Sequence, residues 1–444
     1  MKLLHAILVG LALGGAGLAS ATAAPLPTPK TDDQLRETLL KLNELSSDKI
    51  TLERLRELAK DKPIAKRLVA IAAKMQADAK PKEKPFKFNA AYLLGNLALN
   101  QKDYASAKGF FEFCEETAKK LDSELKLAQA LEGQIDVAYA SKDYARVIAK
   151  CEAVLSIASE ADELEELTRT KTAAIRRMIF AVAKNGDTEK AFRIIDGIPY
   201  KPWYLHQLRS DLHRELDKPD EAIAALEDSM KAMEDDEKLD DETKIALRNR
   251  IRYSTANIYV DLQKVDKAAT ILEQLVKDDP ENPTYPNDLG FIWCDNDKNL
   301  EQAEKLVRKA LEIDEKNRKK LFADKKIDEE TAKKQTAAYL DSLGWVLFKN
   351  KKYSEAETYL LKASEDEEEA EHIEIWDHLA DCYMAQGKVQ LAVDTWTKSL
   401  TFDDVSKRDI ERRKKVSVKL QKAKASLQKK DEKKDEKKDE KEKK

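Results

Sequence analysis

The 444-residue sequence predicts an all-α fold built from paired helices, and three observations support this prediction. Charged residues make up 37% of the chain and hydrophobic residues 42%, a mixture typical of long amphipathic helices. Glycine and proline, which interrupt helices, contribute only 12 residues each. The third observation is an internal repeat, because one pattern of large and small apolar residues returns along most of the chain.

The first 24 residues have the layout of a secretory signal peptide. Lys2 precedes an apolar run from Leu3 to Ala19, and the small residues "SATAAP" follow it. Cleavage after Ala23 or Ala24 would release an exported chain, periplasmic or secreted, with the bacterial envelope as the favoured location. A retained anchor is the alternative, although the run is short for a membrane span and contains four glycines. No later stretch of the sequence is apolar enough to cross a bilayer.

The four cysteines do not form a metal or redox motif. They lie far apart at Cys114, Cys151, Cys294 and Cys382, without a CxxC pair. We expect each to be a small buried residue inside a helix pair. An oxidising compartment would also permit disulfides, and Cys114 and Cys151 could then approach one another.

The segment Ala337 to Ala363 shows the repeat most clearly. A first helix carries small and large apolar residues, the polar turn "KNKKYS" follows, and a second helix completes the unit. The apolar positions are Leu340, Leu343, Gly344 and Leu347, then Ala356, Leu360 and Ala363. This pattern resembles the tetratricopeptide repeat, in which Gly and Ala lie where the two helices approach most closely and large residues fill the space between them.

Related segments extend from Phe88 to Ser406 and give about eight units. The residues equivalent to Ala356 stand at positions 107, 147, 191, 222, 268, 303, 356 and 392. Their spacing varies from 31 to 53 residues, whereas a regular array would repeat every 34. Longer intervals predict extended helices or insertions, such as Arg318 to Thr336, and the shortest predicts a distorted hairpin near "IPYKPWYL". The resemblance implies a right-handed superhelical solenoid with helical caps.

The flanking regions lack the repeat signature. Residues 25–87 are interpreted as an N-terminal helical cap and linker, residues 88–406 as the solenoid, and residues 429–444 as a charged low-complexity tail. Residues 407–428 have helical periodicity and are interpreted as a capping helix that covers the apolar end of the array. The alternative is an amphipathic helix that binds a surface.

Catalytic, metal-binding and nucleotide-binding motifs are missing from the sequence. The five histidines do not have the spacing of a metal site, and no nucleophile elbow, Walker loop or dinucleotide fingerprint occurs. A net charge of −4 provides no basic field for nucleic acid. We therefore predict a protein that is not an enzyme and that uses no cofactor or metal.

The resemblance implies that the first helix of each unit lines a concave binding groove. In the last four units this face combines aromatic residues with Asn and Asp, which suit a protein or peptide partner with basic segments. The predicted groove residues are Tyr253, Asn257, Asn287, Phe291, Asp295, Asp341, Trp345, Phe348, Asp377 and Asp381. The alternative is that Phe291, Trp345 and Phe348 pack between neighbouring units.

Two functional hypotheses follow. The segments "NDLGF", "LDSLGW" and "WDHLAD" resemble bacterial envelope tetratricopeptide proteins, some of which are lipoprotein adaptors for periplasmic proteases; this chain lacks their lipid-anchor cysteine. The first hypothesis is thus an exported scaffold or adaptor. The second is a structural envelope protein that docks on an anionic surface through its C-terminal end, because residues 401–444 carry a net charge of +7.

Overall fold

The computed structural model describes residues 31–44, 58, 61–79, 85–158, 164–366, 369–402 and 406–442. The regular structure within these ranges is helical throughout, which confirms the predicted all-α class. The predicted signal peptide lies outside the described residues. No helix among the described residues is long and apolar enough to cross a membrane. The chain divides into two compact units, one ending at Gly197 and the other beginning at Ile198.

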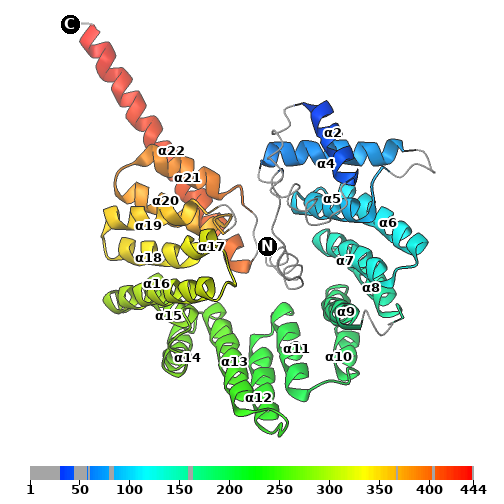
Figure 1. The fold of residues 1–444 in the computed structure, drawn as a ribbon. Coiled ribbons are helices and arrows are strands. Elements are labelled where there is room, and N and C mark those ends of the chain that lie inside the picture. Colours follow the sequence, from blue (N-terminus) through cyan, green and yellow to red (C-terminus); the bar gives the residue numbers. More distant parts are fainter. Residues whose placement is uncertain are drawn as a thin grey trace. The chain divides into compact units, whose positions relative to one another are not determined.

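Within the described residues, the first unit contains two N-terminal helices followed by three helix pairs (Figure 1). The N-terminal helices α2 (Asp32–Glu44) and α4 (Lys62–Asp78) pack on each other, and α4 also packs on the first pair. The pairs are α5 (Phe88–Asn100) with α6 (Tyr104–Leu121), α7 (Glu124–Ala140) with α8 (Tyr144–Leu155), and α9 (Leu164–Lys184) with α10 (Thr188–Asp196).

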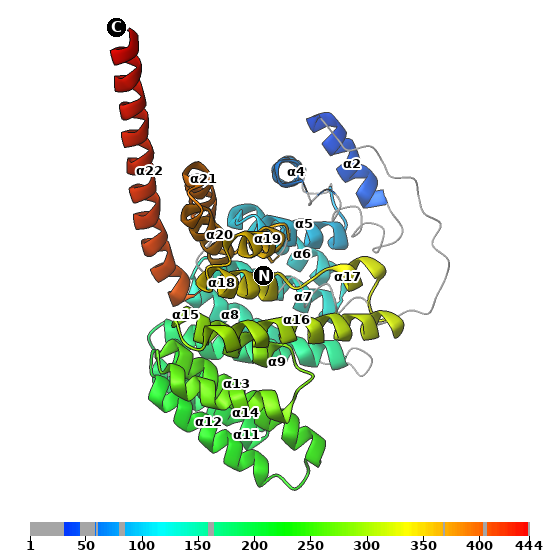
Figure 2. The ribbon, with the colours of Figure 1, turned by 90° about the vertical axis from the view of Figure 1, so that its left-hand side faces the viewer.

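The second unit contains five helix pairs, a short inserted helix and a long terminal helix (Figure 2). The pairs are α11 (Pro202–Glu215) with α12 (Pro219–Glu234), α13 (Asp241–Asp261) with α14 (Val265–Asp278), α15 (Thr284–Asp295) with α16 (Leu300–Ala323), α18 (Ala337–Lys349) with α19 (Tyr353–Ser364), and α20 (Ile373–Ala385) with α21 (Val389–Ser399). The inserted helix is α17 (Glu329–Lys333), and the terminal helix is α22 (Lys407–Glu442).

The same turn joins the two helices of each described pair. One residue adopts a left-handed conformation, and the next residue donates its backbone N–H to a carbonyl five residues earlier, as in a Schellman motif. In α18–α19 the bond from Lys352 N to Leu347 O is 2.9 Å long. The left-handed residues are Lys102, Lys142, Gly186, Asp217, Gln263, Asp297, Lys351 and Gly387. The middle pairs share this turn, although their sequences match the repeat weakly.

The eight anchor positions predicted from the repeat are all fully buried in the described structure. They are Ala107, Val147, Ala191, Ala222, Ala268, Ala303, Ala356 and Ala392. Opposite Ala303 and Ala356 the chain needs glycine, because a Cβ atom at Gly290 would lie 2.8 Å from the carbonyl oxygen of Ala303. A Cβ at Gly344 would lie 2.5 Å from Leu360 Cγ. Close helix contact at these positions confirms the predicted solenoid of helix pairs.

Irregular spacing of the anchors has a structural cause in each case. Helices α9 and α13 each have 21 residues and lengthen their units. The predicted insertion from Arg318 to Thr336 forms the end of the 24-residue α16 and the short α17. Helix α10 has only 9 residues, and the boundary between the two compact units follows directly after it. The four cysteines are buried and free.

Helix α22 begins at Lys407 and continues to Glu442. Its residues Val416, Leu420 and Ala423 belong to the same hydrophobic core as the last four helix pairs, and it packs on α20 and α21. Figures 1 and 2 show its later turns leaving those two helices. The first turns of α22 are therefore part of the packed second unit.

Candidate functional site

The ten predicted groove residues all lie on first helices of the second unit, namely α13, α15, α18 and α20. We call these ten residues the first-helix surface. Asp295 is exposed, and Tyr253, Asn257, Phe291, Phe348 and Asp381 are half-buried. The other four, Asn287, Asp341, Trp345 and Asp377, are buried. The surface thus contains both accessible and buried side chains.

A hydrogen-bonded cluster connects α13 with α15. Tyr253 Oη donates to Asp288 Oδ2 at 2.6 Å, and Asn287 Nδ2 donates to Asp288 Oδ1 at 3.0 Å. Burial raises the pKa of the Asp288 carboxyl above its usual value, although both hydrogen bonds act in the opposite direction. Asp288 was not among the predicted residues, yet it holds Tyr253 and Asn287 in place.

Two buried polar atoms of the first-helix surface lack a hydrogen-bond partner in the described structure. They are the side-chain oxygen Oδ1 of Asn287 and the indole nitrogen Nε1 of Trp345. Leaving a buried polar group unpaired costs about 1–3 kcal/mol. The Asn287 oxygen on α15 is an acceptor and the Trp345 nitrogen on α18 is a donor.

An aromatic stack lies between α18 and α20. The Trp345 ring is 4.9 Å from the Phe348 ring and 4.1 Å from the His378 ring, measured between centroids, and both pairs are nearly parallel. His378 Nδ1 lies 3.0 Å from both carboxylate oxygens of Asp341. Burial lowers the pKa of His378, but the charge and hydrogen bond of Asp341 outweigh it and raise the pKa overall. The packing interpretation therefore describes Trp345 and Phe348 well.

Asp377 on α20 is the electrostatic centre of the surface. Lys419 Nζ donates to Asp377 Oδ1 at 2.8 Å and to Asp381 Oδ2 at 2.6 Å. Arg412 Nη1 lies 3.3 Å from Asp377 Oδ2, and Trp396 Nε1 donates to Asp377 Oδ1 at 2.9 Å. Burial favours the protonated form of Asp377, but the charge and hydrogen bond of Lys419 outweigh it and lower its pKa. Burial and the charge of Asp377 raise the pKa of Asp381.

The cations that meet these carboxylates come from α22. Besides Asp377, Arg412 binds Glu374 on α20, and Arg408 Nη2 lies 2.5 Å from Asp261 Oδ1 at the end of α13. The sequence indicated that the surface would attract basic side chains, but not that the chain itself supplies them. Helical spacing of Arg408 and Arg412 with Val416 was the signal available for this arrangement.

Two sequence models of the tetratricopeptide repeat match this chain, over residues 253–318 and residues 336–366. Both segments consist of the helix pairs described above. The chain therefore contains tetratricopeptide repeats in these two segments. The matched segments contain the first-helix surface except for Asp377 and Asp381 on α20.

Solved structures similar to this protein include yeast Tom70, with 16% identity over 89% of this chain and 82% of that one and a TM-score of 0.49. MamA from Desulfovibrio magneticus RS-1 is 15% identical over 46% of this chain and 96% of its own, with a TM-score of 0.32. PilW, a type IV pilus biogenesis factor, is 16% identical over 52% and 93%, with a TM-score of 0.36. No curated protein matches the sequence.

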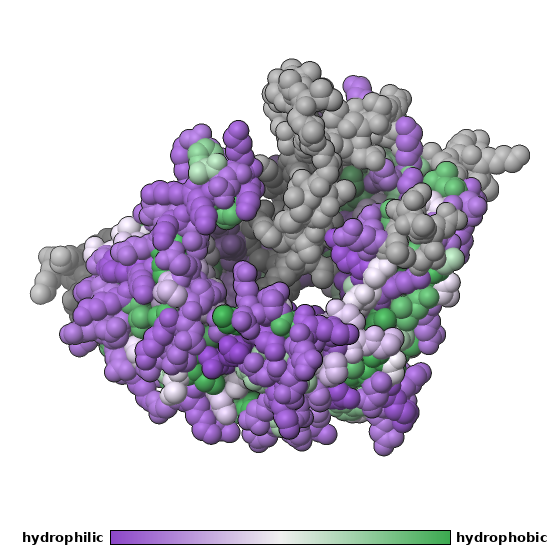
Figure 3. All heavy atoms as spheres, turned by 60° about the horizontal axis from the view of Figure 1, so that its bottom comes forward, coloured by the Kyte–Doolittle hydropathy of each residue, from purple (hydrophilic) through white to green (hydrophobic). Residues whose placement is uncertain are grey.

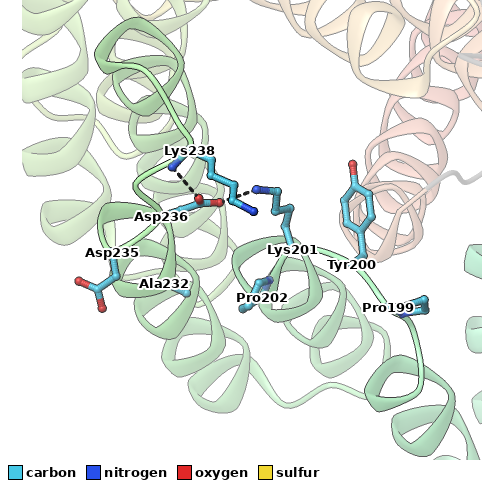
Figure 4. Close-up of a pocket in the computed structure, with 8 residues that line it drawn as sticks. All are labelled: Pro199, Tyr200, Lys201, Pro202, Ala232, Asp235, Asp236 and Lys238. Atoms are coloured by element: carbon cyan, nitrogen blue, oxygen red, sulfur yellow. Dashed lines mark hydrogen bonds and ion pairs between the residues drawn. The ribbon is translucent and has the colours of Figure 1, made fainter.

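A pocket of the second unit lies beside α11 and α12. It is an open pocket of about 630 Å³ (Figure 4). Lys201, Asp236 and Lys238 gather on one side of it, with Lys201 Nζ 3.0 Å from Asp236 Oδ2, and Pro199 and Tyr200 lie on the other. Within the described residues no group of His, Cys, Asp and Glu has the arrangement of a metal site. The face drawn in Figure 3 is mostly hydrophilic, with hydrophobic residues scattered in small groups.

Proposed function

We propose that this protein is an exported, non-enzymatic scaffold or adaptor that binds a protein segment on its first-helix surface. Tetratricopeptide repeats are generally protein-interaction modules, and the two matched segments contain most of this surface. The observation that carries the proposal is the group of accessible side chains on this surface, the exposed Asp295 with the half-buried Phe291 and Asp381.

Charge supports a basic partner. Asp261, Asp295 and Asp381 lie at the accessible edge of the surface, and the cations that already meet it are Arg and Lys side chains of α22. Aromatic side chains beside these carboxylates can contribute contact area at low entropic cost. Asp295 is exposed, so a partner can reach it without rearrangement of the core.

Affinity capture from the exported fraction of the producing cells tests the proposal. The wild type is compared with a double variant of the surface, Phe291→Ala with Asp295→Lys, and captured proteins are identified by mass spectrometry. The matched control carries the same substitution types on the second helix α16, where Glu312 and Phe322 are exposed: Phe322→Ala with Glu312→Lys.

A partner that binds the wild type and the α16 control, and binds the surface variant at least tenfold more weakly, supports the proposal. Thermal unfolding of all three proteins checks that the variants are folded. Equal binding by all three would show that the partner uses another face. Loss of binding in both variants would equally contradict the assignment of the first-helix surface.

The second candidate is a structural envelope protein that docks through α22 and the charged tail. Exposed Lys414, Lys415 and Lys422 on α22 favour it, because their ammonium groups are available to an anionic surface. Cosedimentation with anionic lipid vesicles tests this function. Binding that is lost in Lys414→Glu with Lys415→Glu and Lys422→Glu would support it, and unchanged binding would remove it.

A further inference from the structure

We infer that the first turns of α22 are an intramolecular ligand of the first-helix surface, and that the partner is a basic amphipathic helix that takes the place of α22. This inference rests on the proposed function and specifies the chemistry of the partner. It also implies that the surface of the isolated chain is already occupied.

The ion pairs of α22 reach two of the four first helices, α13 and α20. Arg408 reaches Asp261 at the end of α13, Arg412 reaches Glu374 and Asp377 on α20, and Lys419 bridges Asp377 and Asp381. A helix that only covered the apolar end of the array would need contacts with α20 and α21. The ion pair with α13 joins residues 147 positions apart and brings the start of α22 to a helix far from the end of the array.

Buried carboxylates make the surface dependent on an external cation. The side chain of Asp377 is 3% exposed, and its charge is met by Lys419 and Arg412. Removing both cations would leave a buried charge with only the Trp396 indole and its neighbour His378, which is a strongly unfavourable state. A segment that displaces α22 must therefore bring cations to the same places, which excludes neutral and acidic partners.

Apolar contacts of α22 set a second requirement. Val416, Leu420 and Ala423 are buried in the core of the second unit. A replacing helix therefore has cations at its first, fifth and twelfth positions, counted from Arg408, and apolar residues at its ninth, thirteenth and sixteenth. This spacing fits an α-helix and does not fit an extended peptide.

The connection between α21 and α22 sets the affinity that a competing partner helix needs. Helix α21 ends at Ser399 and α22 begins at Lys407, so the intramolecular ligand is held by a short connection. A short tether gives an effective concentration of roughly millimolar. A free helix of the same sequence therefore binds the wild-type chain far more weakly than it binds a chain whose own α22 has been released.

The test uses the full chain and a labelled synthetic peptide that copies residues 406–428. The release variant is Arg412→Glu with Lys419→Glu. The matched control, Lys415→Glu with Lys422→Glu, changes the charge of α22 equally at exposed positions. A milder release variant, Arg412→Ala with Lys419→Ala, keeps the test usable if the first does not fold, and circular dichroism monitors folding.

We expect the release variant to bind the peptide at least tenfold more tightly than the wild type and the control do. A peptide with Glu at the positions of Arg408, Arg412 and Lys419 should not bind. Equal peptide affinity for release variant and control would overturn the inference and identify α22 as a permanent cap. The proposed function is tested separately, and it stands if binding of the captured partner depends on Phe291 and Asp295. If neither the tighter peptide binding nor this dependence is observed, the inference and the proposed function are both wrong.

Discussion

Both compact units pair a carboxylate of a first helix with cations, half-buried in the first unit and buried in the second, but they neutralise it differently. In the first unit, Asp136 on α7 meets Arg177 from α9, with Nη2 and Oδ1 2.8 Å apart, and Glu132 shares the same guanidinium at 3.6 Å. Burial raises the pKa of Asp136 to about 7; Arg177 opposes this rise and Glu132 adds to it. In the second unit, Asp377 is held by Lys419 and Arg412, and its pKa is lowered.

This difference separates an ion pair formed inside the repeats from one that joins the repeats to an appended helix. Arg177 belongs to the repeats themselves, so the pairing of Asp136 is complete within the array. The cations that serve Asp377 belong to α22, a helix appended after the last pair. In the second unit, the charge of Asp377 is therefore neutralised by cations from outside the helix pairs. In the first unit, an arginine of the repeats neutralises Asp136.

Removal of one cation should produce the largest loss of stability, and the size of the loss should differ between the two units. Arg412→Met leaves the Asp377 carboxylate buried without its guanidinium partner, and we expect a loss of about 3 kcal/mol. Arg177→Met should cost less at pH 5, because Asp136 with a pKa of about 7 is already protonated there. Urea unfolding followed by hydrogen exchange of each unit measures both. Equal losses in the two units at pH 5 would contradict the comparison.

Glycines at equivalent repeat positions provide the next test. A Cβ at Gly290 in the second unit would lie 2.8 Å from a backbone oxygen, whereas at Gly95 in the first unit its nearest neighbour is the Phe111 ring edge at 2.9 Å. We expect Gly290→Ala to cost about 2 kcal/mol through overpacking. At Gly95→Ala the ring can shift, and a gain in helix propensity of up to about 1 kcal/mol offsets the strain. Thermal unfolding of the two variants measures the difference, and similar melting temperatures would refute it.

Asp136 also predicts a pH dependence of the first unit. The pKa of Asp136 rises from its usual value near 4 to about 7 on folding, so the folded state holds a proton that the unfolded state releases. Stability of the first unit should therefore fall as the pH rises from 4 to 7 and level off above 7. Asp136→Asn should flatten this slope. Denaturant midpoints measured at several pH values report the result, and an unchanged slope would disprove the assignment.

The smallest effect is expected at the exposed end of α22. The side chains of Arg408 and Asp261 are 52% and 46% exposed, and such pairs contribute at most about 1 kcal/mol. Arg408→Gln should therefore barely change the stability of the second unit, and high salt should mask the change. A loss comparable to that of Arg412→Met would show that this contact matters more than its exposure suggests.

Most of the fold could be predicted from the local spacing of residues in the sequence. The eight anchor positions could be placed because seven lie five residues after the left-handed residue of their turn and Ala303 lies six after it, and all eight are buried. The site was harder to predict. Burial of Asp341 and Trp345 depends on His378, which packs against both from a different repeat. The ion pair between Arg408 and Asp261 joins residues 147 apart, and no local pattern reports such a contact.

Hydrogen exchange of residues 406–428 in the wild-type chain tests the central claim most directly. The chain is incubated with increasing concentrations of the unlabelled peptide that copies those residues, and exchange is followed by mass spectrometry. If α22 is a displaceable ligand, its amides should exchange faster as the peptide concentration rises, while those of α18 and α20 should not. Protection of α22 that stays constant at every peptide concentration would contradict the account.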